Sequence, residues 1–246
     1  MDQTSHMTVM SAEIGIIGAM KIEVEALCAA MTDTVSETVG SMEFVLGTLR
    51  GRRVVCAKCG IGKVFAAMCA EAMILRYAPA VIVNSGVAGT LSPELSIGQV
   101  ALADLVVQHD MDTSPLGDPV GLIPGIDKVF LPTDSRVADA LAACVSAEGV
   151  PYRRGVIASG DRFVASAEEK ARIRALFDAP GHPVVACEME GAAIGQVCYV
   201  HGVPCGILRA ISDGGDDHAF ADYPAFLAAA AQTATAVMLR FVENWG

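Results

Sequence analysis

Three acidic positions lie where an apolar stretch of this chain gives way to a polar one. Glu23 comes three residues after the run IGIIGAM, Glu188 and Glu190 close the stretch VVACEME, and Asp213 ends the segment GILRAISD. Any one of these carboxylates alone would suit a solvated surface. The glutamate pair, however, sits at an otherwise apolar junction, where burying a carboxylate without a purpose is costly. Carboxylates so placed indicate general acid–base chemistry.

The segments that carry these carboxylates alternate between predicted strands and predicted helices. Apolar runs predict buried strands at 13–20, 79–89, 96–109, 152–159, 183–190 and 202–212. Apolar residues at helical spacing predict helices at 21–31, 64–78, 134–149, 166–177, 191–202 and 223–245. Short strands separated by Gly-containing turns at 36–60 predict an antiparallel meander.

This alternation predicts the α/β class, as a three-layer αβα architecture with a central mixed, largely parallel twisted sheet and helices on both faces. Parallel strands bring their carboxyl ends to one edge, where ligands bind in such folds. We therefore expect Glu23, Glu190 and Asp213 to converge there. The Pro- and Gly-rich segment 111–128 predicts a long functional or interface loop. We expect one domain over residues 13–246, preceded by a flexible leader at 1–12.

The composition narrows the possible partners. Apolar residues make up 53% of the 246 residues, charged residues 18%, and the formal net charge is -11. Nucleic-acid affinity depends on Lys and Arg neutralising phosphates, so a nucleic-acid partner is disfavoured, as is an anionic membrane surface. No apolar run reaches the roughly 18 residues of a membrane span, and the first residues lack the pattern of a secretory signal. Eight scattered cysteines suit a reducing cytoplasm.

Neither a metal site nor a cofactor site is predicted. Cys56 and Cys59 have C-x-x-C spacing but lack a second pair or nearby histidines, and the segment HDMD at 109–112 is too short to be specific. Gly15 and Gly18 lack the third glycine of a dinucleotide fingerprint, and GIGK is not a Walker A sequence. Without a phosphate cradle, nucleosides are favoured over nucleotides.

Six segments occur in an order that resembles a known superfamily. They are GIIGAMKIEVEAL, CGIGKVFAA, VNSGVAGTL, GVIASGDRFV, CEMEGAAIGQVC and RAISD. In this order they are similar to the purine nucleoside phosphorylase/uridine phosphorylase superfamily, and most similar to its 5'-methylthioadenosine/S-adenosylhomocysteine nucleosidases. The resemblance runs from about Glu13 to the end of the chain. CEMEGAA followed by RAISD is specific for the superfamily, and GAM-x-x-E distinguishes the nucleosidases from their phosphorolytic relatives.

The resemblance implies how the N-glycosidic bond would break. Asp213 would be the general acid that protonates adenine N7, positioned by Ser212. Glu23 would be the general base on the attacking water, with Arg209 near that water. Glycosidic bonds break through an oxocarbenium-like transition state, and adenine leaves poorly as an anion, so a positioned acid contributes roughly 10²–10⁴-fold. The pKa of Asp213 must then be raised, and we expect burial to raise it.

The resemblance also implies contacts to the base and the sugar. Phe163 would stack on adenine, and the backbone of Val164 would read the edge of the base. Glu190 would bond the ribose hydroxyls and stabilise charge in the transition state, and Met189 would pack on the sugar face. Gly89 would let the backbone approach the nucleoside closely.

The resemblance does not determine which 5' substituent the substrate carries. Met20 and Ile61 complete the implied substrate contacts. Val87 stands where the family often has a serine. The loop that would cover the 5' group of a neighbouring subunit offers Leu116, Asp118 and Pro124 but no aromatic residue. Methylthio, homocysteinyl and deoxy 5' groups all stay possible, and a homodimer is expected.

Two alternatives differ in chemistry. A phosphorylase of the same fold would need cations for phosphate, typically an arginine in the first strand-to-helix loop. That loop here reads GAMKIE, and Glu23 would repel phosphate although Lys21 is cationic. A non-catalytic nucleoside-binding protein would be expected to have lost the acid or the base. Hydrolysis is therefore the favoured reaction.

Overall fold

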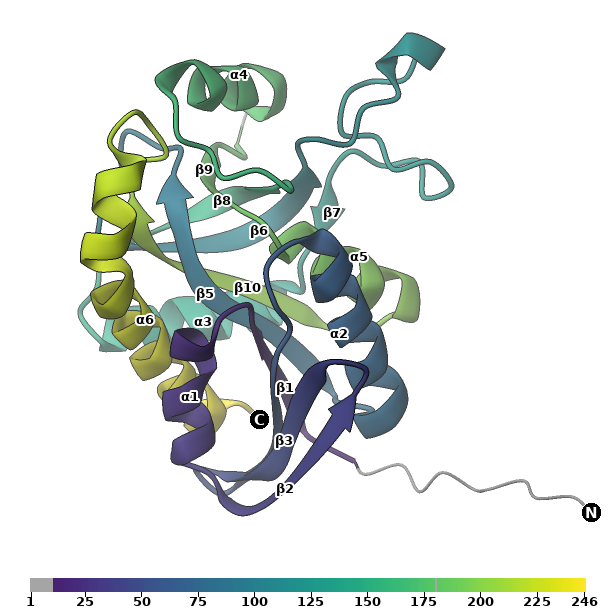
Figure 1. Ribbon diagram of the computed structural model, residues 1–246, viewed down its shortest axis with the longest axis vertical. Coiled ribbons are helices and arrows are strands. Elements are labelled where there is room, and N and C mark those ends of the chain that lie inside the picture. Colours follow the sequence, from purple (N-terminus) through teal and green to yellow (C-terminus); the bar gives the residue numbers. More distant parts are fainter. Residues whose placement is uncertain (1–10, 180) are drawn as a thin grey trace, which may run out of the picture.

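The computed structural model describes residues 11–179 and 181–246, so all but the last two residues of the expected leader at 1–12 lie outside the described part. The strands are β1 (Ile14–Gly18), β2 (Thr32–Val39), β3 (Met42–Leu49), β4 (Arg52–Lys58), β5 (Val81–Thr90), β6 (Val100–Gln108), β7 (Leu131–Pro132), β8 (Tyr152–Ser159), β9 (Val184–Glu188) and β10 (Cys205–Asp213). The helices are α1 (Lys21–Ala29), α2 (Lys63–Tyr77), α3 (Ser135–Ala147), α4 (Ala167–Phe177), α5 (Gly191–His201) and α6 (Ala219–Asn244) (Figure 1).

The strands form one mixed sheet that closes on itself at one end. From the outer strand β2 the order runs β3, β4, β1 and β5. β5 then pairs with both β10 and β9, and β10, β6, β8 and β9 pair in turn, so that these five strands make a ring. The mixed sheet and the antiparallel β2–β3–β4 meander are confirmed. Five pairings among the described residues are antiparallel, a larger share than "largely parallel" suggests.

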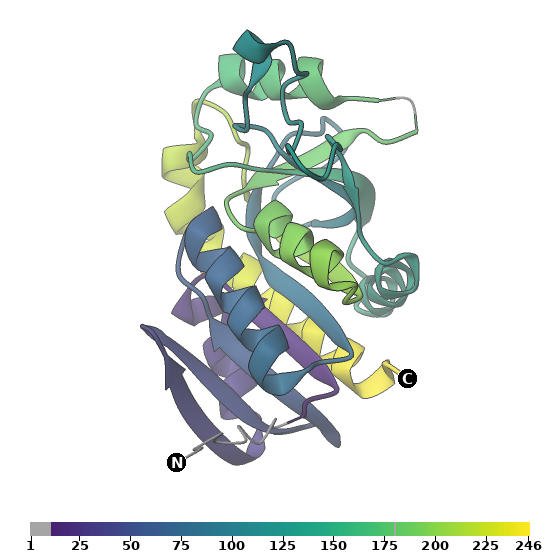
Figure 2. The ribbon, with the colours of Figure 1, turned by 90° about the vertical axis from the view of Figure 1, so that its right-hand side faces the viewer.

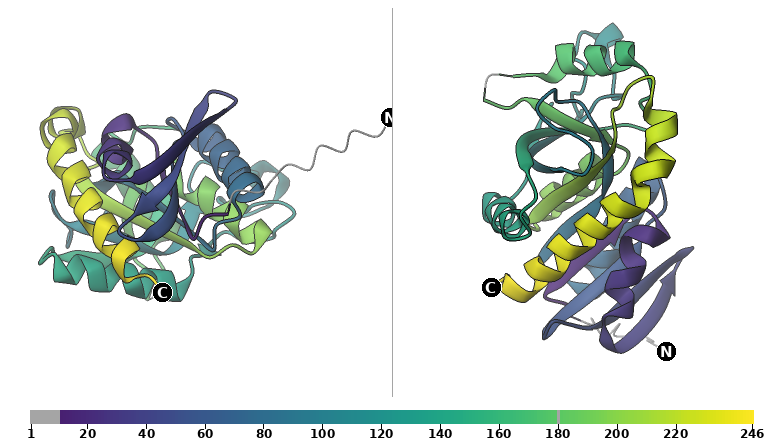
Figure 3. Two further views of the ribbon diagram at one scale, coloured as in Figure 1. Left: turned by 90° about the horizontal axis from the view of Figure 1, so that it is seen from below. Right: turned by 90° about the vertical axis from the view of Figure 1, so that its left-hand side faces the viewer.

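Helices cover both faces of the sheet, which confirms the three-layer architecture. One core cluster joins α2 and α5 to the sheet through residues such as Met73 and Ile194. The other joins α1, α3 and α6 through residues such as Leu27, Leu141 and Phe241. Figure 3 shows α6 running along its face beside α1, while Figure 2 shows α2 and α5 on the opposite one. α4 packs separately across the end of the ring, through Ile173 and Phe177.

Local signals set several of the helix ends. Asp134 caps α3 by accepting hydrogen bonds from the Arg136 and Val137 amides at 3.0 and 3.1 Å, and Gly149, with φ of +71°, follows its end. Both were expected. α6 begins at Ala219, four residues before the expected start at Tyr223. The Ala221 and Asp222 amides donate to the His218 carbonyl, so the helix is already formed before its proline.

α6 is long and apolar enough to cross a membrane by length and composition alone. In this structure its buried residues, among them Val237 and Phe241, pack against the α1–α3 face of the sheet. Its apolar stripe is therefore explained by the core. The predicted long loop follows β6 and stands away from the body of the molecule, with a single short 3₁₀ turn at Ser114–Leu116 (Figure 1).

Candidate active site

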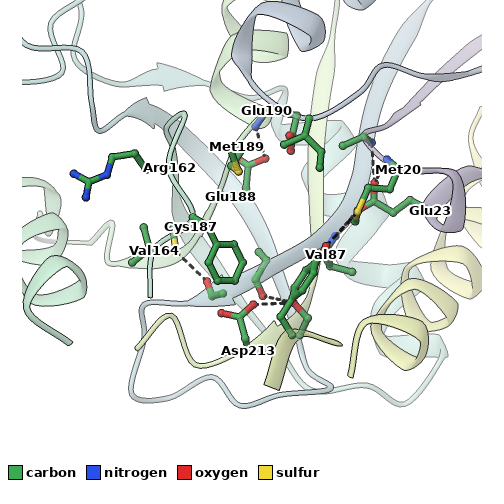
Figure 4. Close-up of a pocket in the computed structure, with 17 residues that line it drawn as sticks. Met20, Glu23, Val87, Arg162, Val164, Cys187, Glu188, Met189, Glu190 and Asp213 are labelled. Carbon is green, nitrogen blue, oxygen red and sulfur yellow. Dashed lines mark hydrogen bonds between the residues drawn. The ribbon is translucent and has the colours of Figure 1, made fainter. Parts of the chain in front are cut away.

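A cavity of about 290 Å³ opens where several strands end. Its walls come from the carboxyl ends of β5, β9 and β10 and from the segments that follow β1, β4 and β8, with Tyr223 of α6 at one side. Figure 4 shows Asp213, Glu190 and Glu23 approaching this space from three sides. The predicted residues that line it are Met20, Glu23, Ile61, Gly89, Phe163, Val164, Met189, Glu190, Ser212 and Asp213.

Three residues that the sequence associates with the substrate do not line the cavity. Leu116 is 83% exposed on the projecting loop, and Pro124 lies in the same loop, so in this chain neither reaches its own site. Arg209 is fully buried beneath the wall, where its guanidinium donates to Glu188 and Asn84. It therefore acts on the cavity through its charge and through Glu188.

Asp213 is held by two hydrogen bonds at the end of β10. Oδ1 accepts from the Gly215 amide at 2.9 Å, and Oδ2 accepts from the Ser212 hydroxyl at 2.9 Å. Burial raises the pKa of Asp213, Asp222 and Asp216 act in the same direction, and the two donors oppose them. The carboxyl group thus lines the cavity with its proton retained to higher pH than usual, as a general acid requires.

Glu23 closes the opposite end of the cavity from the first turn of α1. Oε2 accepts from the Ala19 and Met20 amides at 2.7 and 2.9 Å, and Oε1 accepts from the Val87 amide at 3.1 Å. Burial raises the pKa of Glu23, while Arg209 and these three backbone donors lower it. A carboxylate whose pKa moves toward neutrality is a stronger base, and its geometry is fixed by β5 and by its own helix.

Two glycines of β5 make room for the two carboxylates. A Cβ on Gly86 would lie 2.6 Å from Oε1 of Glu23, and a Cβ on Gly89 would lie 2.6 Å from Oδ1 of Asp213. The resemblance implied that Gly89 lets the backbone approach the nucleoside closely. The structure gives a further reason for glycine at this position, since any side chain there would displace the Asp213 carboxyl group.

Glu190 and Glu188 both line the cavity but differ in their hydrogen-bond partners. Glu190 lines the cavity, accepts from the Gly62 amide at 2.8 Å and lies 3.9 Å from the Arg209 guanidinium. Burial, together with the neighbouring Glu188, raises the pKa of Glu190 to about 7, against the effect of Arg209. Glu188 is instead engaged by Arg209, by the Ser159 hydroxyl and by the Glu190 and Gly191 amides. Glu190 is thus the member of the pair that is free to bind a ligand.

Aromatic rings gather at one wall of the cavity. Phe163, which is 41% exposed, meets the ring of Tyr223 edge-on at 5.5 Å and that of Phe220 at 5.6 Å. The Tyr223 hydroxyl lies 3.2 Å from the sulfur of Met20. Tyr223 was not predicted as a site residue from the sequence. The aromatic residues in FADYPAF recur at every third position, which is the one signal that could have placed them on a helix face.

In 11–179 and 181–246, no group of three or more His, Cys, Asp or Glu side chains is arranged to hold a metal ion. Within HDMD, Asp110 instead accepts from the Lys63 ammonium at 2.6 Å. The eight cysteines are all free thiols.

Comparisons with known proteins agree with this geometry. Residues 13–243 match the phosphorylase superfamily. The chain is 36% identical over 232 residues to a 5'-methylthioadenosine/S-adenosylhomocysteine nucleosidase of Shewanella oneidensis, covering 94% of this chain and 97% of that protein. It superposes with a TM-score of 0.88 and 35% identity on the nucleosidase of Neisseria meningitidis in complex with methylthio-immucillin-A, covering 94% and 98% of the two chains. Futalosine hydrolase of Helicobacter pylori is similar too, with a TM-score of 0.88, 34% identity, and 96% and 98% coverage.

Proposed function

The chain belongs to the phosphorylase superfamily as an N-glycosyl hydrolase of the 5'-methylthioadenosine/S-adenosylhomocysteine nucleosidase group, and we propose that Asp213, Glu23 and Glu190 carry out its reaction. Residues 13–246 act as one catalytic domain on small adenine nucleosides in this proposal. The observation that carries it is the convergence of three buried carboxylates, from three separate elements, on one cavity.

In the proposed reaction, each of these three carboxylates has a separate role. Asp213 donates its proton to adenine N7, so that adenine leaves as a neutral base. Glu190 bonds the ribose hydroxyls and, in its ionised form, stabilises the positive charge that develops on the sugar. Glu23 takes a proton from the water that attacks the anomeric carbon. The raised pKa of Asp213 keeps the acid protonated. Burial also raises the pKa of Glu23, and Arg209 and three amide donors act against that shift by favouring its ionised form.

Water is favoured over phosphate as the nucleophile by the charges at the Glu23 end of the cavity. Among the described residues that line the cavity, Arg162 alone is cationic, and it pairs with Glu169 at 3.4 Å. Arg209 is occupied by Glu188 and Asn84. A phosphate dianion beside Glu23 would meet a carboxylate with no uncommitted cation to offset the repulsion.

In this proposal, the adenine base and the 5' group of the substrate contact different walls of the cavity. Phe163 stacks on adenine beside the Val164 backbone, and Met189 packs on the sugar. Met20, Ile61 and Tyr223 surround the 5' group. This part of the cavity is apolar apart from the Tyr223 hydroxyl, which suits a methylthio or deoxy substituent.

We further propose that the chain works as a cytoplasmic homodimer. Val64, Phe65 and Met68 on α2 are 70, 45 and 50% exposed beside Ile61 of the site. The projecting loop carries Leu116 and Pro124 away from its own cavity. A second copy would cover the α2 surface and extend this loop over the 5' end of the neighbouring site. Free cysteines suit a reducing compartment.

The deciding experiment is adenine release from 5'-methylthioadenosine, measured with and without phosphate and with the sugar product identified. Release without phosphate, giving free methylthioribose, is expected. Release that requires phosphate and yields a sugar 1-phosphate would overturn the role given to Glu23. Parallel assays with S-adenosylhomocysteine and 5'-deoxyadenosine then rank the 5' groups.

A further inference from the structure

One peptide group connects the candidate acid to a lysine outside the cavity. The amide of Gly215 donates to Oδ1 of Asp213 at 2.9 Å, and the carbonyl of Gly214, the other end of the same peptide unit, accepts from the Lys170 ammonium at 2.8 Å. Lys170 belongs to α4 and is half-buried, and it is not part of the cavity wall. The peptide plane is therefore held from both ends.

Without these two contacts, the peptide plane between Gly214 and Gly215 would be free to rotate. It joins two glycines, and Gly215 has a φ of +58°, so side chains impose no restriction on either side of the plane. Because the carbonyl and the amide of a trans peptide point in opposite directions, a flip that turned the carbonyl away from Lys170 would also turn the amide away from Asp213. A contact to the carbonyl thus fixes the contact to the acid.

α4 also follows directly on the segment that would hold the base. Phe163 and Val164 lie three and two residues before Ser166, whose hydroxyl caps α4 by accepting from the Glu169 amide at 3.2 Å. Lys170 lies on the next turn of the same helix. The helix therefore links the base wall to the turn that carries the proton donor.

We propose that Lys170 is a positioning residue for the proton transfer: by holding the Gly214–Gly215 peptide, it fixes the Oδ1 contact of Asp213 and couples that contact to the base-binding segment. This inference rests on the function proposed above. Lys170 touches neither substrate nor reacting atoms, so it acts on the rate and not on substrate binding.

The test compares Lys170→Met with Arg174→Gln. Methionine keeps the length of the side chain and removes the donor. Arg174 is a cation of the same helix whose guanidinium pairs with Asp178 at 3.3 Å and does not reach the Gly214 turn. With 5'-methylthioadenosine, Lys170→Met should lower kcat about tenfold, because the free energy of a hydrogen bond to a charged group corresponds to roughly a tenfold change in rate. KM should stay within about twofold, and Arg174→Gln should match the wild type.

A pH profile separates a positioning role of Lys170 from an effect of its positive charge alone. The Gly215 amide lowers the pKa of Asp213, whereas Asp216 on the same turn and Asp222 on α6 raise it. If the amide turns away, the pKa of Asp213 rises, and kcat is lost at higher pH than in the wild type. The maximum of the bell-shaped profile falls as well, because the acid is misplaced even when protonated. A loss of charge alone would shift the high-pH limb and leave the maximum unchanged.

The outcomes are distinct. A fall in kcat for Lys170→Met with the shifted high-pH limb and a lowered profile maximum supports the inference. An unchanged kcat or profile maximum, or an equal fall in Arg174→Gln, overturns it. If the wild type releases no adenine from any nucleoside, the proposed function fails by itself. The inference about Lys170 is then judged by a crystal structure of Lys170→Met, where an unchanged Gly214–Gly215 plane refutes it and a turned plane supports it.

Discussion

Replacing Gly89 with alanine tests how closely the acid must be placed. The φ of Gly89 lies outside the left-handed region, so alanine meets no backbone strain there. Its Cβ would lie 2.6 Å from Oδ1 of Asp213 and 3.2 Å from Cα of Gly215, whereas ordinary contact begins at 3.4 Å. The carboxyl group must therefore retreat by about 0.8 Å, the difference between the first and last of these distances.

A displacement of this size should lower mainly kcat. Misplacing a reacting group by about 1 Å can cost roughly 10²-fold, which is within the roughly 10²–10⁴-fold that a general acid supplies. We expect Gly89→Ala to lower kcat for adenine release about 10²-fold. Overpacking should cost about 1–3 kcal/mol of the free energy of unfolding, so the variant should still fold.

The assay is the initial rate of adenine release, with a thermal melt on the same preparation. Gly40→Ala, in the β2–β3 turn, is the matched control. Gly40 has a φ of +62° and no atom within 4 Å of an added Cβ, so alanine there strains the backbone far from the cavity. It should cost about 1–2 kcal/mol of stability with kcat unchanged. A Gly89→Ala enzyme with more than half the wild-type kcat would refute the reasoning.

Three further predictions concern the proposed roles. Asp213→Asn should lose roughly 10²–10⁴-fold in kcat with a thermal midpoint close to that of the wild type, and a smaller loss would remove the acid assignment. Burial raises the pKa of Glu190 from an ordinary 4.5 to about 7, so wild-type stability should fall as pH rises through this interval. Melts of Glu190→Gln should show less of that fall between pH 5 and 8. Phe65→Glu should yield monomers in size-exclusion chromatography if α2 forms the dimer interface, and an unchanged elution volume would contradict that interface.

Much of the fold could be predicted because central strands such as β1, β9 and the first part of β5 are apolar runs that give way to polar residues. β5, β9 and β10 each end at or next to a residue of the site, and these strand ends can be located from the sequence. The closure of the ring could not be predicted. It depends on β5 pairing with β9 only through its last two residues, Gly89 and Thr90, a contact without any local pattern.

The burial of Arg209 is a feature that residue spacing could not predict. Residues at even spacing on a regular strand point to the same face, so a regular β10 would present Arg209 and Asp213 on the same side. A register shift between Ile211 and Asp213 breaks that alternation. Arg209 consequently turns under the wall to Glu188, while Asp213 lines the cavity. A one-residue irregularity of this kind leaves no mark in the hydrophobic pattern.

The closed ring of β5, β10, β6, β8 and β9 has a consequence for local opening. Each of these strands pairs on both sides, so none can detach without breaking two ladders, whereas β2 pairs with β3 alone. In native-state hydrogen exchange, the amides of β10 and β5 should exchange only through global unfolding, and those of β2 through fraying at much lower free energy. The strands that carry the proton donor and its glycine thus belong to the slowest-exchanging part of the molecule.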